Sequence, residues 1–193
     1  RPITAKVGKA IIQKDLENAV KIYLAEVHEK EQDEAKEARK RLAEDWDYKK
    51  ALEYFPKHLR FERTMLSNLS EYPNDYAGAL RDLPKFLRIM FTYAYQSELF
   101  NRFLDKVMER GLDYTEGPLY GFESQFANKL ERQVLEEEGI TCEEFKVDSM
   151  PEMSSRGKRR ELFINLKDLK ILEEGEEYYV VRFSLPKGTY ATV

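Results

Sequence analysis

A short basic run near the C-terminal end carries the residue types best suited to binding a charged ligand. The run reads SSRGKRR and holds four cations within five residues, Arg156, Lys158, Arg159 and Arg160. Its glycine places it in a loop just ahead of a predicted strand, and binding residues concentrate on loops held by a rigid scaffold. Cations at this density suit phosphate groups, and arginine forks suit them best. A solvated loop whose charges offset an acidic surface explains the same run equally well.

A second candidate anion site lies in KGTYA, residues 187–191, between a predicted strand and a predicted helix start. Backbone N–H groups at a helix N-terminus attract anions, and Lys187 lies beside them. The Tyr190 ring can stack on a nucleobase, because aromatic faces accept any base. The residues alone favour a simpler interpretation, an ordinary strand-to-helix turn with Tyr190 in the core.

The motifs of common catalytic and metal sites do not occur in the sequence. There is no glycine-rich phosphate loop, no HExxH and no Ser-His-Asp order, and no carboxylate lies in an apolar context. The single cysteine, Cys142, excludes an internal disulfide and a cysteine-based zinc site. The two histidines, His28 and His58, are far apart in charged surroundings, so we expect no histidine-rich metal site. The residues alone show no active site.

The composition is typical of a globular protein, with 42% hydrophobic residues, 35% charged residues and a formal net charge of −4. No apolar run approaches the roughly 20 residues of a membrane helix. The negative charge argues against a uniformly basic surface but leaves room for one local basic face. One cysteine and no signal peptide fit a cytoplasmic protein, which is our expectation. The chain begins at Arg1-Pro2 without a methionine, so we expect processing or a longer parent chain.

One long helix, from Pro84 to Arg110, is predicted to organise the chain. Pro84 suits a first helical turn, Gly111 suits a C-terminal cap, and no Gly or Pro interrupts the segment. Apolar residues recur at helical spacing, at Phe86, Met90, Tyr93, Phe100, Leu104 and Val107. The stretch 89–97 carries no charge, which predicts a helix that is buried on several sides, with its aromatic residues in the core.

Shorter helices are predicted around this one. Before it, the spacing indicates helices over residues 9–14, 16–27, 28–45, 48–55, 59–69 and 74–80. The segment 28–45 is charge-rich, and we expect a solvated helix with one thin apolar edge. A loop is predicted over 111–123, followed by a helix over 125–138 that continues over 140–145.

The pattern changes from helix to strand near residue 150. Strands are predicted over residues 161–166, 169–172 and 178–185. The last one is apolar on both faces, so we expect it to be covered on both sides. Three short strands make too small a sheet to stand alone, and they need partner strands that the sequence does not contain. The predicted fold class is α+β.

Five segments, in order along nearly the whole chain, resemble motifs of the tRNA pseudouridine synthase family typified by TruD. FSLPKGTYATV at 183–193 looks like the terminal signature of that family, and AYQSELFNRFL at 94–104 resembles its long-helix motif. RPITAKVGKAI at 1–11, NDYAGALRDLPK at 74–85 and MPEMSSRGKRRELF at 150–163 are similar to the archaeal type.

The resemblance implies a catalytic pseudouridine-synthase domain that is interrupted by a helical insertion domain. Residues 1–150 would be mostly that insertion domain, and residues 151–193 would return to the catalytic sheet. The implied reaction isomerises a uridine in the tRNA D-arm, at position thirteen, to pseudouridine without a metal or organic cofactor. An aspartate nucleophile performs this chemistry in the family, and its motif would lie ahead of Arg1, outside this chain. We therefore assign no catalytic residue and expect the chain alone to be inactive.

The resemblance also implies where tRNA would bind. The matched positions expected to line the cleft between the two domains are Arg1, Arg156, Lys158, Arg159, Arg160, Lys187 and Tyr190. tRNA is then the expected partner of a monomeric protein that uses neither a membrane nor a metal. The alternative is a helical module that binds RNA or another protein without catalysis.

Overall fold

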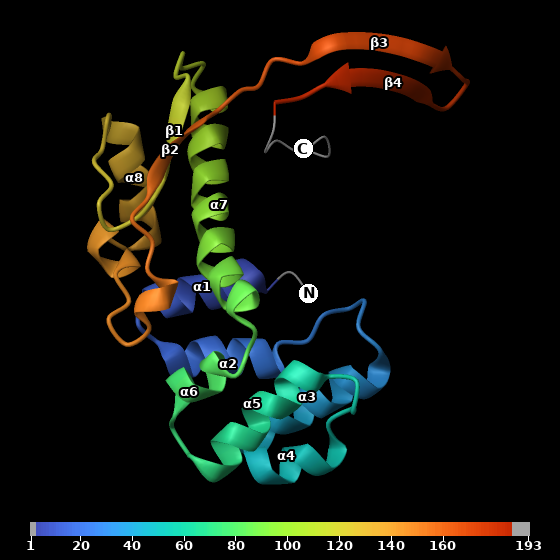
Figure 1. Cartoon of the computed structure of the whole chain (residues 1–193), viewed down its shortest axis with the longest axis vertical. Coiled ribbons are helices and arrows are strands. Elements are labelled where there is room, and N and C mark those ends of the chain that lie inside the picture. Colours follow the sequence, from blue (N-terminus) through green and yellow to red (C-terminus); the bar gives the residue numbers. More distant parts are fainter. Residues whose placement is uncertain (1–2, 187–193) are drawn as a thin grey trace.

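A single long helix forms the axis of the structure, a computed structural model that describes residues 3–186. Helix α7 (Lys85–Glu109) runs upright through the molecule, with the N-terminal helices below it and the strands near its upper end (Figure 1). Pro84 precedes its first residue, and the chain leaves the helix through Gly111, whose φ is +60°. The predicted long helix is confirmed at both ends.

One face of α7 is exposed, although the sequence predicted burial on several sides. Phe86, Met90 and Tyr93 are 71%, 45% and 57% exposed. Their spacing of four and three residues places them on one face of the helix, which we call the exposed stripe. The buried face carries Phe91, Thr92, Tyr95, Gln96, Leu99, Phe100, Phe103 and Val107. The absence of charge was a poor guide, because it does not tell which side of a helix has a partner.

Six helices precede α7 in the described residues. They are α1 (Thr4–Ile12), α2 (Leu16–Ala25), α3 (Asp33–Asp45), α4 (Tyr48–Tyr54), α5 (Arg60–Glu71) and α6 (Tyr76–Arg81). Asp15, Asp47 and Asp75 cap three of them by accepting backbone N–H groups. Helix α1 crosses α7 closely, and a Cβ added to Gly8 would lie 2.0 Å from the Phe91 carbonyl oxygen. The crossing therefore requires glycine.

Helix α3 is held in place by a buried arginine that its charge-rich sequence did not reveal. The expected apolar edge is buried, at Ala35, Ala38 and Leu42. Arg39 is buried as well, and its guanidinium donates to the carbonyl oxygens of Tyr23 (3.2 Å) and Leu24 (2.7 Å). It also pairs with Glu31 (3.1 Å) and with Glu62 of α5 (2.7 Å). These bonds connect α3 to α2 and α5.

The segment after α7 is less helical than its sequence predicted. Helix α8 (Lys129–Glu138) begins later than expected, because the Asn128 side chain caps it. The predicted continuation over residues 140–145 is only a 3₁₀ turn, η1 (Cys142–Phe145). A second 3₁₀ turn, η2 (Pro151–Met153), precedes the basic run.

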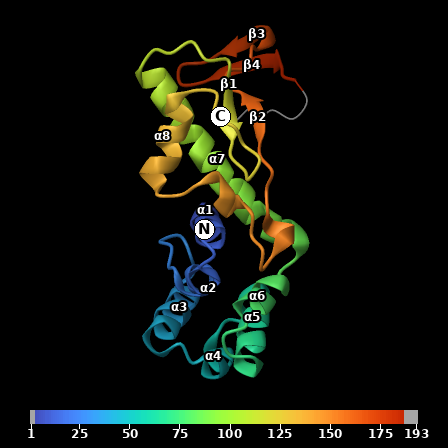
Figure 2. The same ribbon diagram turned by 90° about the vertical axis from the view of Figure 1, so that its left-hand side faces the viewer.

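The strands form two separate antiparallel pairs. β1 (Glu116–Leu119) pairs with β2 (Lys158–Glu161), and β3 (Lys167–Glu174) pairs with β4 (Tyr179–Ser184). The β1–β2 pair lies alongside α7, as does α8 (Figure 2). β1 falls within a predicted loop, and only Glu161 of the strand predicted over 161–166 lies in β2, because each strand depends on a partner remote in sequence. The predicted class of mixed helices and strands is confirmed.

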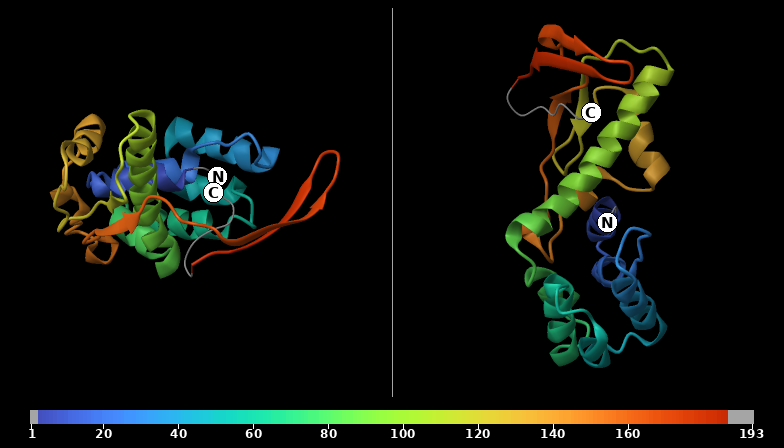
Figure 3. Two further views of the ribbon diagram at one scale, coloured as in Figure 1. Left: turned by 90° about the horizontal axis from the view of Figure 1, so that it is seen from above. Right: turned by 90° about the vertical axis from the view of Figure 1, so that its right-hand side faces the viewer.

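The β3–β4 hairpin projects away from the helices (Figure 3). Its apolar side chains are exposed on both faces, at Leu169, Ile171, Leu172, Tyr178, Tyr179, Val180 and Val181. The sequence predicted that other parts of the protein pack on both faces of the last strand, but no part of residues 3–186 does so. Both outer edges of the hairpin are also unpaired among the described strands.

Replacing Arg39 by alanine should lower the free energy of unfolding by about 3–5 kcal/mol, because the buried Glu62 carboxylate loses the cation that neutralises it. Lys50→Ala removes an exposed ion pair with Asp45 and should cost less than about 1 kcal/mol. Urea unfolding followed by circular dichroism measures both effects. Equal losses in the two variants would contradict a stabilising role for the Arg39 network.

Candidate nucleic-acid interface

Two loops remote in sequence lie side by side at the start of the basic run. The Phe122 N–H donates to the Ser155 carbonyl oxygen (2.9 Å), and the Glu123 N–H donates to the Arg156 carbonyl oxygen (3.0 Å). These two bonds join the loop after β1 to the loop before β2. The backbone that carries the cations is therefore fixed from both sides.

Glycine is required on both loops where they approach most closely. A Cβ on Gly121 would lie 2.0 Å from the Gly157 nitrogen, and a Cβ on Gly157 would lie 2.3 Å from the Ser124 Oγ. Gly157 also has a φ of +86°, where L side chains are strained. The glycine in the basic run thus serves close packing rather than flexibility.

Three residues of α7, spaced four apart, fasten the segment that leads into the basic run. Arg88 donates a hydrogen bond to the Glu152 carboxylate (3.3 Å), and the Thr92 hydroxyl donates one to the Met153 carbonyl oxygen (2.9 Å). One turn further along, the Gln96 Nε2 donates to the Ser155 Oγ at 2.7 Å. The same Nε2 donates to the Tyr120 carbonyl oxygen on the other loop. Gln96 is buried, so this side chain of the AYQSELF motif holds both loops against α7.

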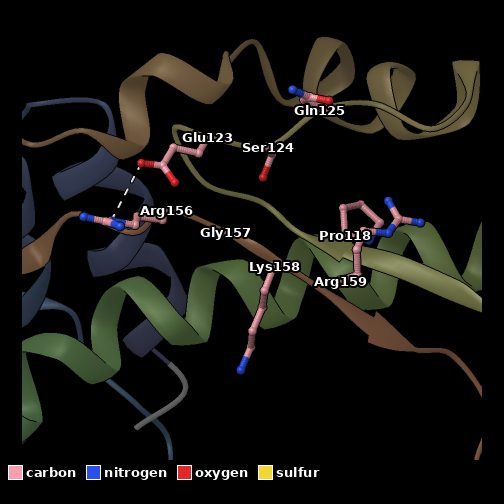
Figure 4. Close-up of a pocket in the computed structure, with 8 residues that line it drawn as sticks. All are labelled: Pro118, Glu123, Ser124, Gln125, Arg156, Gly157, Lys158 and Arg159. Atoms are coloured by element: carbon pink, nitrogen blue, oxygen red, sulfur yellow. Dashed lines mark ion pairs between the residues drawn. The ribbon is translucent and has the colours of Figure 1, made fainter.

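Strand β2 divides the basic run between two faces, as the alternation of a strand requires. In Figure 4 the Lys158 and Arg159 side chains leave the strand on opposite sides. The Arg159 guanidinium lies 2.7 Å from the Glu131 carboxylate of α8, which is fully buried. Arg159 therefore anchors β2 to α8.

A cavity of about 280 Å³ lies on the Arg159 side of β2 (Figure 4). Its charges are mixed, because Arg156 lies 3.7 Å from Glu123 and Glu131 neutralises Arg159. Two of the three cations that line this cavity, Arg156 and Arg159, are thus paired with carboxylates, whereas the third, Lys158, has no such pair among residues 3–186.

A larger cavity of about 550 Å³ lies between α7 and β2, and we call it the basic cavity. Arg156, Lys158 and Arg160 line it, and none of the described residues that line it is acidic. The Arg160 guanidinium lies 5.3 Å from the centre of the Phe100 ring. Lys158 forms no ion pair with any residue in the range 3–186. Lys158 and Arg160 therefore give the basic cavity a positive charge that no carboxylate of the described residues pairs with.

The structure brings together three of the four cations of the basic run. Arg159 is the fourth and lies on the opposite side of β2. Three further residues expected at the RNA site lie outside the described residues, Arg1, Lys187 and Tyr190. The sequence did not predict that three polar or aromatic residues of α7 line the basic cavity, Tyr93, Gln96 and Ser97. These three residues belong to the charge-free stretch 89–97, from which the sequence predicts a buried helix instead of a cavity wall.

A buried carboxylate links α8 to α1 and α7. Glu138, the last residue of α8, accepts hydrogen bonds from Lys9 of α1 (2.8 Å), from Tyr95 of α7 (3.2 Å) and from Arg102. Burial alone would raise the pKa of Glu138, but the Lys9 hydrogen bond and the Arg102 charge outweigh it and lower the pKa below its ordinary value. The carboxylate is therefore charged at neutral pH.

Two potential nucleophiles of the described residues, Tyr120 and Cys142, are protonated. Burial raises the pKa of the Tyr120 hydroxyl and of the Cys142 thiol, so both are uncharged at neutral pH. Residues 3–186 contain no group of three or more His, Cys, Asp and Glu side chains placed to hold a metal ion. In the same range, no helix is long and apolar enough to cross a membrane. The site in these residues is suited to binding an anion.

The whole chain matches the sequence model of one protein family. The model of tRNA pseudouridine synthase D (TruD) matches residues 1–117 and 114–193. A protein of Methanopyrus kandleri named "Probable tRNA pseudouridine synthase D" is 41% identical over 210 residues, covering 100% of this chain and 52% of that protein. A protein of the same name from Methanococcoides burtonii is 34% identical over 245 residues, covering 100% of this chain and 56% of that protein.

A solved structure has the same fold throughout. The crystal structure of a Methanosarcina mazei protein named "Putative tRNA pseudouridine synthase D (TruD)" has a TM-score of 0.90 and 32% sequence identity, and the match covers 100% of this chain and 56% of that chain. Fold and sequence together define a member of a tRNA-modifying family. The chain belongs to the tRNA pseudouridine synthase D (TruD) family, which confirms the resemblance of its motifs. It spans about half the length of the relatives that it matches.

Gly157→Ala should destabilise the protein more than Gly111→Ala. Both positions have positive φ, so both substitutions carry a strain of about 1–2 kcal/mol. Position 157 adds a clash with the Ser124 hydroxyl worth about 1–3 kcal/mol, whereas nothing lies within 4 Å of a Cβ at position 111. Thermal unfolding of the two variants measures the difference. If both lose the same stability, the close contact between the loops is not important.

Proposed function

We propose that the full protein isomerises a uridine of tRNA to pseudouridine. The observation that carries the proposal is membership of the TruD family along the whole chain. The basic cavity supports it, because a positively charged cavity without carboxylates is suited to the phosphates of RNA. The acidic net charge of the chain makes such a local basic face necessary for binding.

The proposed reaction breaks the C1′–N1 glycosidic bond and forms a C1′–C5 bond within the same nucleotide. An aspartate carboxylate outside residues 1–193 attacks the extruded nucleoside, the base detaches and rotates, and it rejoins the ribose through C5. The proton lost from C5 is balanced by one gained at N1, so the isomerisation needs no oxidant, metal or organic cofactor. We propose position thirteen of the D-arm as the target.

We propose that the chain combines a helical insertion domain with part of a catalytic sheet. The sequence predicted the boundary at residue 150, and the pairing of β2 with β1 supports a boundary further along the chain. The boundary that we propose lies between β2 and β3. The exposed apolar faces and unpaired edges of the β3–β4 hairpin support this division, because such a hairpin is stable only when other structure covers it.

We propose that Arg156, Lys158 and Arg160 contact tRNA phosphates, while Arg159 keeps β2 in place through Glu131. Arg1, Lys187 and Tyr190 remain predicted tRNA contacts. The monomeric state and the cytoplasmic location also remain predictions.

Tritium release from tRNA labelled at C5 of uridine tests the reaction. The full protein should release tritium, because C5 loses its hydrogen after it bonds to C1′. A polypeptide limited to residues 1–193 should release none, because the proposed nucleophile lies outside it. Release by the shorter polypeptide would contradict that placement of the nucleophile. Binding of tRNA by the full protein without release would instead favour a non-catalytic RNA-binding module.

Changing Arg156, Lys158 and Arg160 together to alanine should weaken tRNA binding and reduce its salt dependence. Each lost phosphate contact lowers the slope of log affinity against log salt by about 0.7–0.9, so three lower it by about 2–3. The control variant removes the same charge from α3 and α4 by changing Lys40, Lys49 and Lys50 to alanine. Binding is measured over a salt series, and circular dichroism checks folding. Unchanged affinity and slope in the first variant would show that the basic run is only a solvated loop.

A further inference from the structure

The basic cavity contains an aromatic side chain that the packing of the protein does not use. Tyr93 was expected in the core, yet it is mostly exposed and lines the cavity from α7. Within residues 3–186 its ring contacts no other aromatic ring, and its hydroxyl makes no hydrogen bond. The face of this ring is therefore accessible to a ligand.

The cations around Tyr93 are accessible as well. Lys158 has no ion pair among the described residues, and the Arg160 guanidinium contacts the face of the Phe100 ring. Arg156 lies 3.7 Å from Glu123, but both side chains are mostly exposed, so this pair is weak. A ligand with negative charge would find these cations without having to displace a buried carboxylate.

The remaining wall of the cavity is polar and rigid. The Ser97 hydroxyl is exposed and makes no hydrogen bond to the described residues, so it can donate one and accept one. The Gln96 Nε2 donates a hydrogen bond to the Ser155 Oγ (2.7 Å), which keeps α7 and the basic run at a fixed separation. The volume of about 550 Å³ lies in the range of about 300–1,000 Å³ that is usual for small-ligand sites.

We propose that the basic cavity binds one unpaired nucleotide of an RNA strand. Its base stacks on Tyr93, and the adjoining phosphates contact Lys158 and Arg160. A paired nucleotide is excluded, because its base is stacked within a duplex and presents no face to Tyr93. An aromatic platform beside a cationic groove is a general means of binding single-stranded nucleic acid. The proposal rests on the proposed function only in taking RNA as the ligand.

A protein segment is a less suitable occupant. The exposed stripe could pack against an apolar surface, but an apolar partner would leave Lys158 and Arg160 without counter-charges. RNA supplies an apolar base face and negative phosphates within the same unit.

The test compares Tyr93→Ala with Tyr93→Phe in the full protein, using two fluorescent RNAs of equal length, a single-stranded oligouridylate and a duplex. Tyr93→Ala should weaken binding of the single strand by about 5- to 150-fold, with an unchanged salt slope. Tyr93→Phe keeps the ring and should keep the affinity. Neither variant should change binding of the duplex. Wild-type affinity of Tyr93→Ala for the single strand, or an equal loss for both RNAs, would overturn the proposal.

Met90→Ala is the matched control, because Met90 belongs to the exposed stripe but does not line the basic cavity. It should leave binding of the single strand unchanged. A loss as large as that of Tyr93→Ala would show that the stripe as a whole forms a docking surface, and the single-nucleotide site would be wrong.

Tritium release separates this proposal from the proposed function. If the full protein releases no tritium but the contrast between Tyr93→Ala and Tyr93→Phe holds, the nucleotide site is supported and the reaction is wrong. If Tyr93→Ala modifies tRNA with the wild-type KM and binds the single strand normally, the nucleotide site is wrong and the reaction is supported.

Discussion

A buried amide must be hydrogen-bonded, and the amide of Gln96 is bonded to two loops that are remote from it in sequence. An unsatisfied amide at this position would cost about 1–3 kcal/mol, so the loops cannot leave α7 without a penalty. Arg88 and Thr92 extend the same line of bonds along the helix. The basic run is therefore positioned by the face of a helix as well as by the glycine in its own loop. This explains how a glycine-containing loop can form a cavity of defined shape.

The sequence was sufficient where the structural signal lies within one element. Pro84 and Gly111 marked both ends of α7, and Gly139 marked the end of α8. The sequence was insufficient to predict an element that depends on a partner remote along the chain. β2 is a strand over 158–161 because residues 116–119 pair with it, and no local pattern contains that information. Arg39 looked like one charge among many, since its carbonyl and carboxylate partners come from α2, the following loop and α5.

The sequence likewise predicted one part of the candidate site and missed another. Charge density identified the basic run, and three of its four cations line one cavity. The sequence did not show which of the four cations points away from the basic cavity. That depends on the register of β2, which directs Arg159 to Glu131. Tyr93 was missed for a related reason. A charge-free helix can be buried or can present apolar side chains to a ligand, and periodicity alone does not distinguish the two.

The close crossing at Gly8 has a consequence for synthesis of the protein. The side chains of Val7, Ile11 and Ile12 are fully buried, and α1 packs mainly on α7 and α2. A ribosome makes α1 before α7, and roughly 80 residues separate Gly8 from its contact at Phe91. At about 5–20 residues per second, α7 emerges about 4–17 s after α1. During that interval the apolar face of α1 lacks its main partner, so the nascent chain exposes side chains that the folded protein buries.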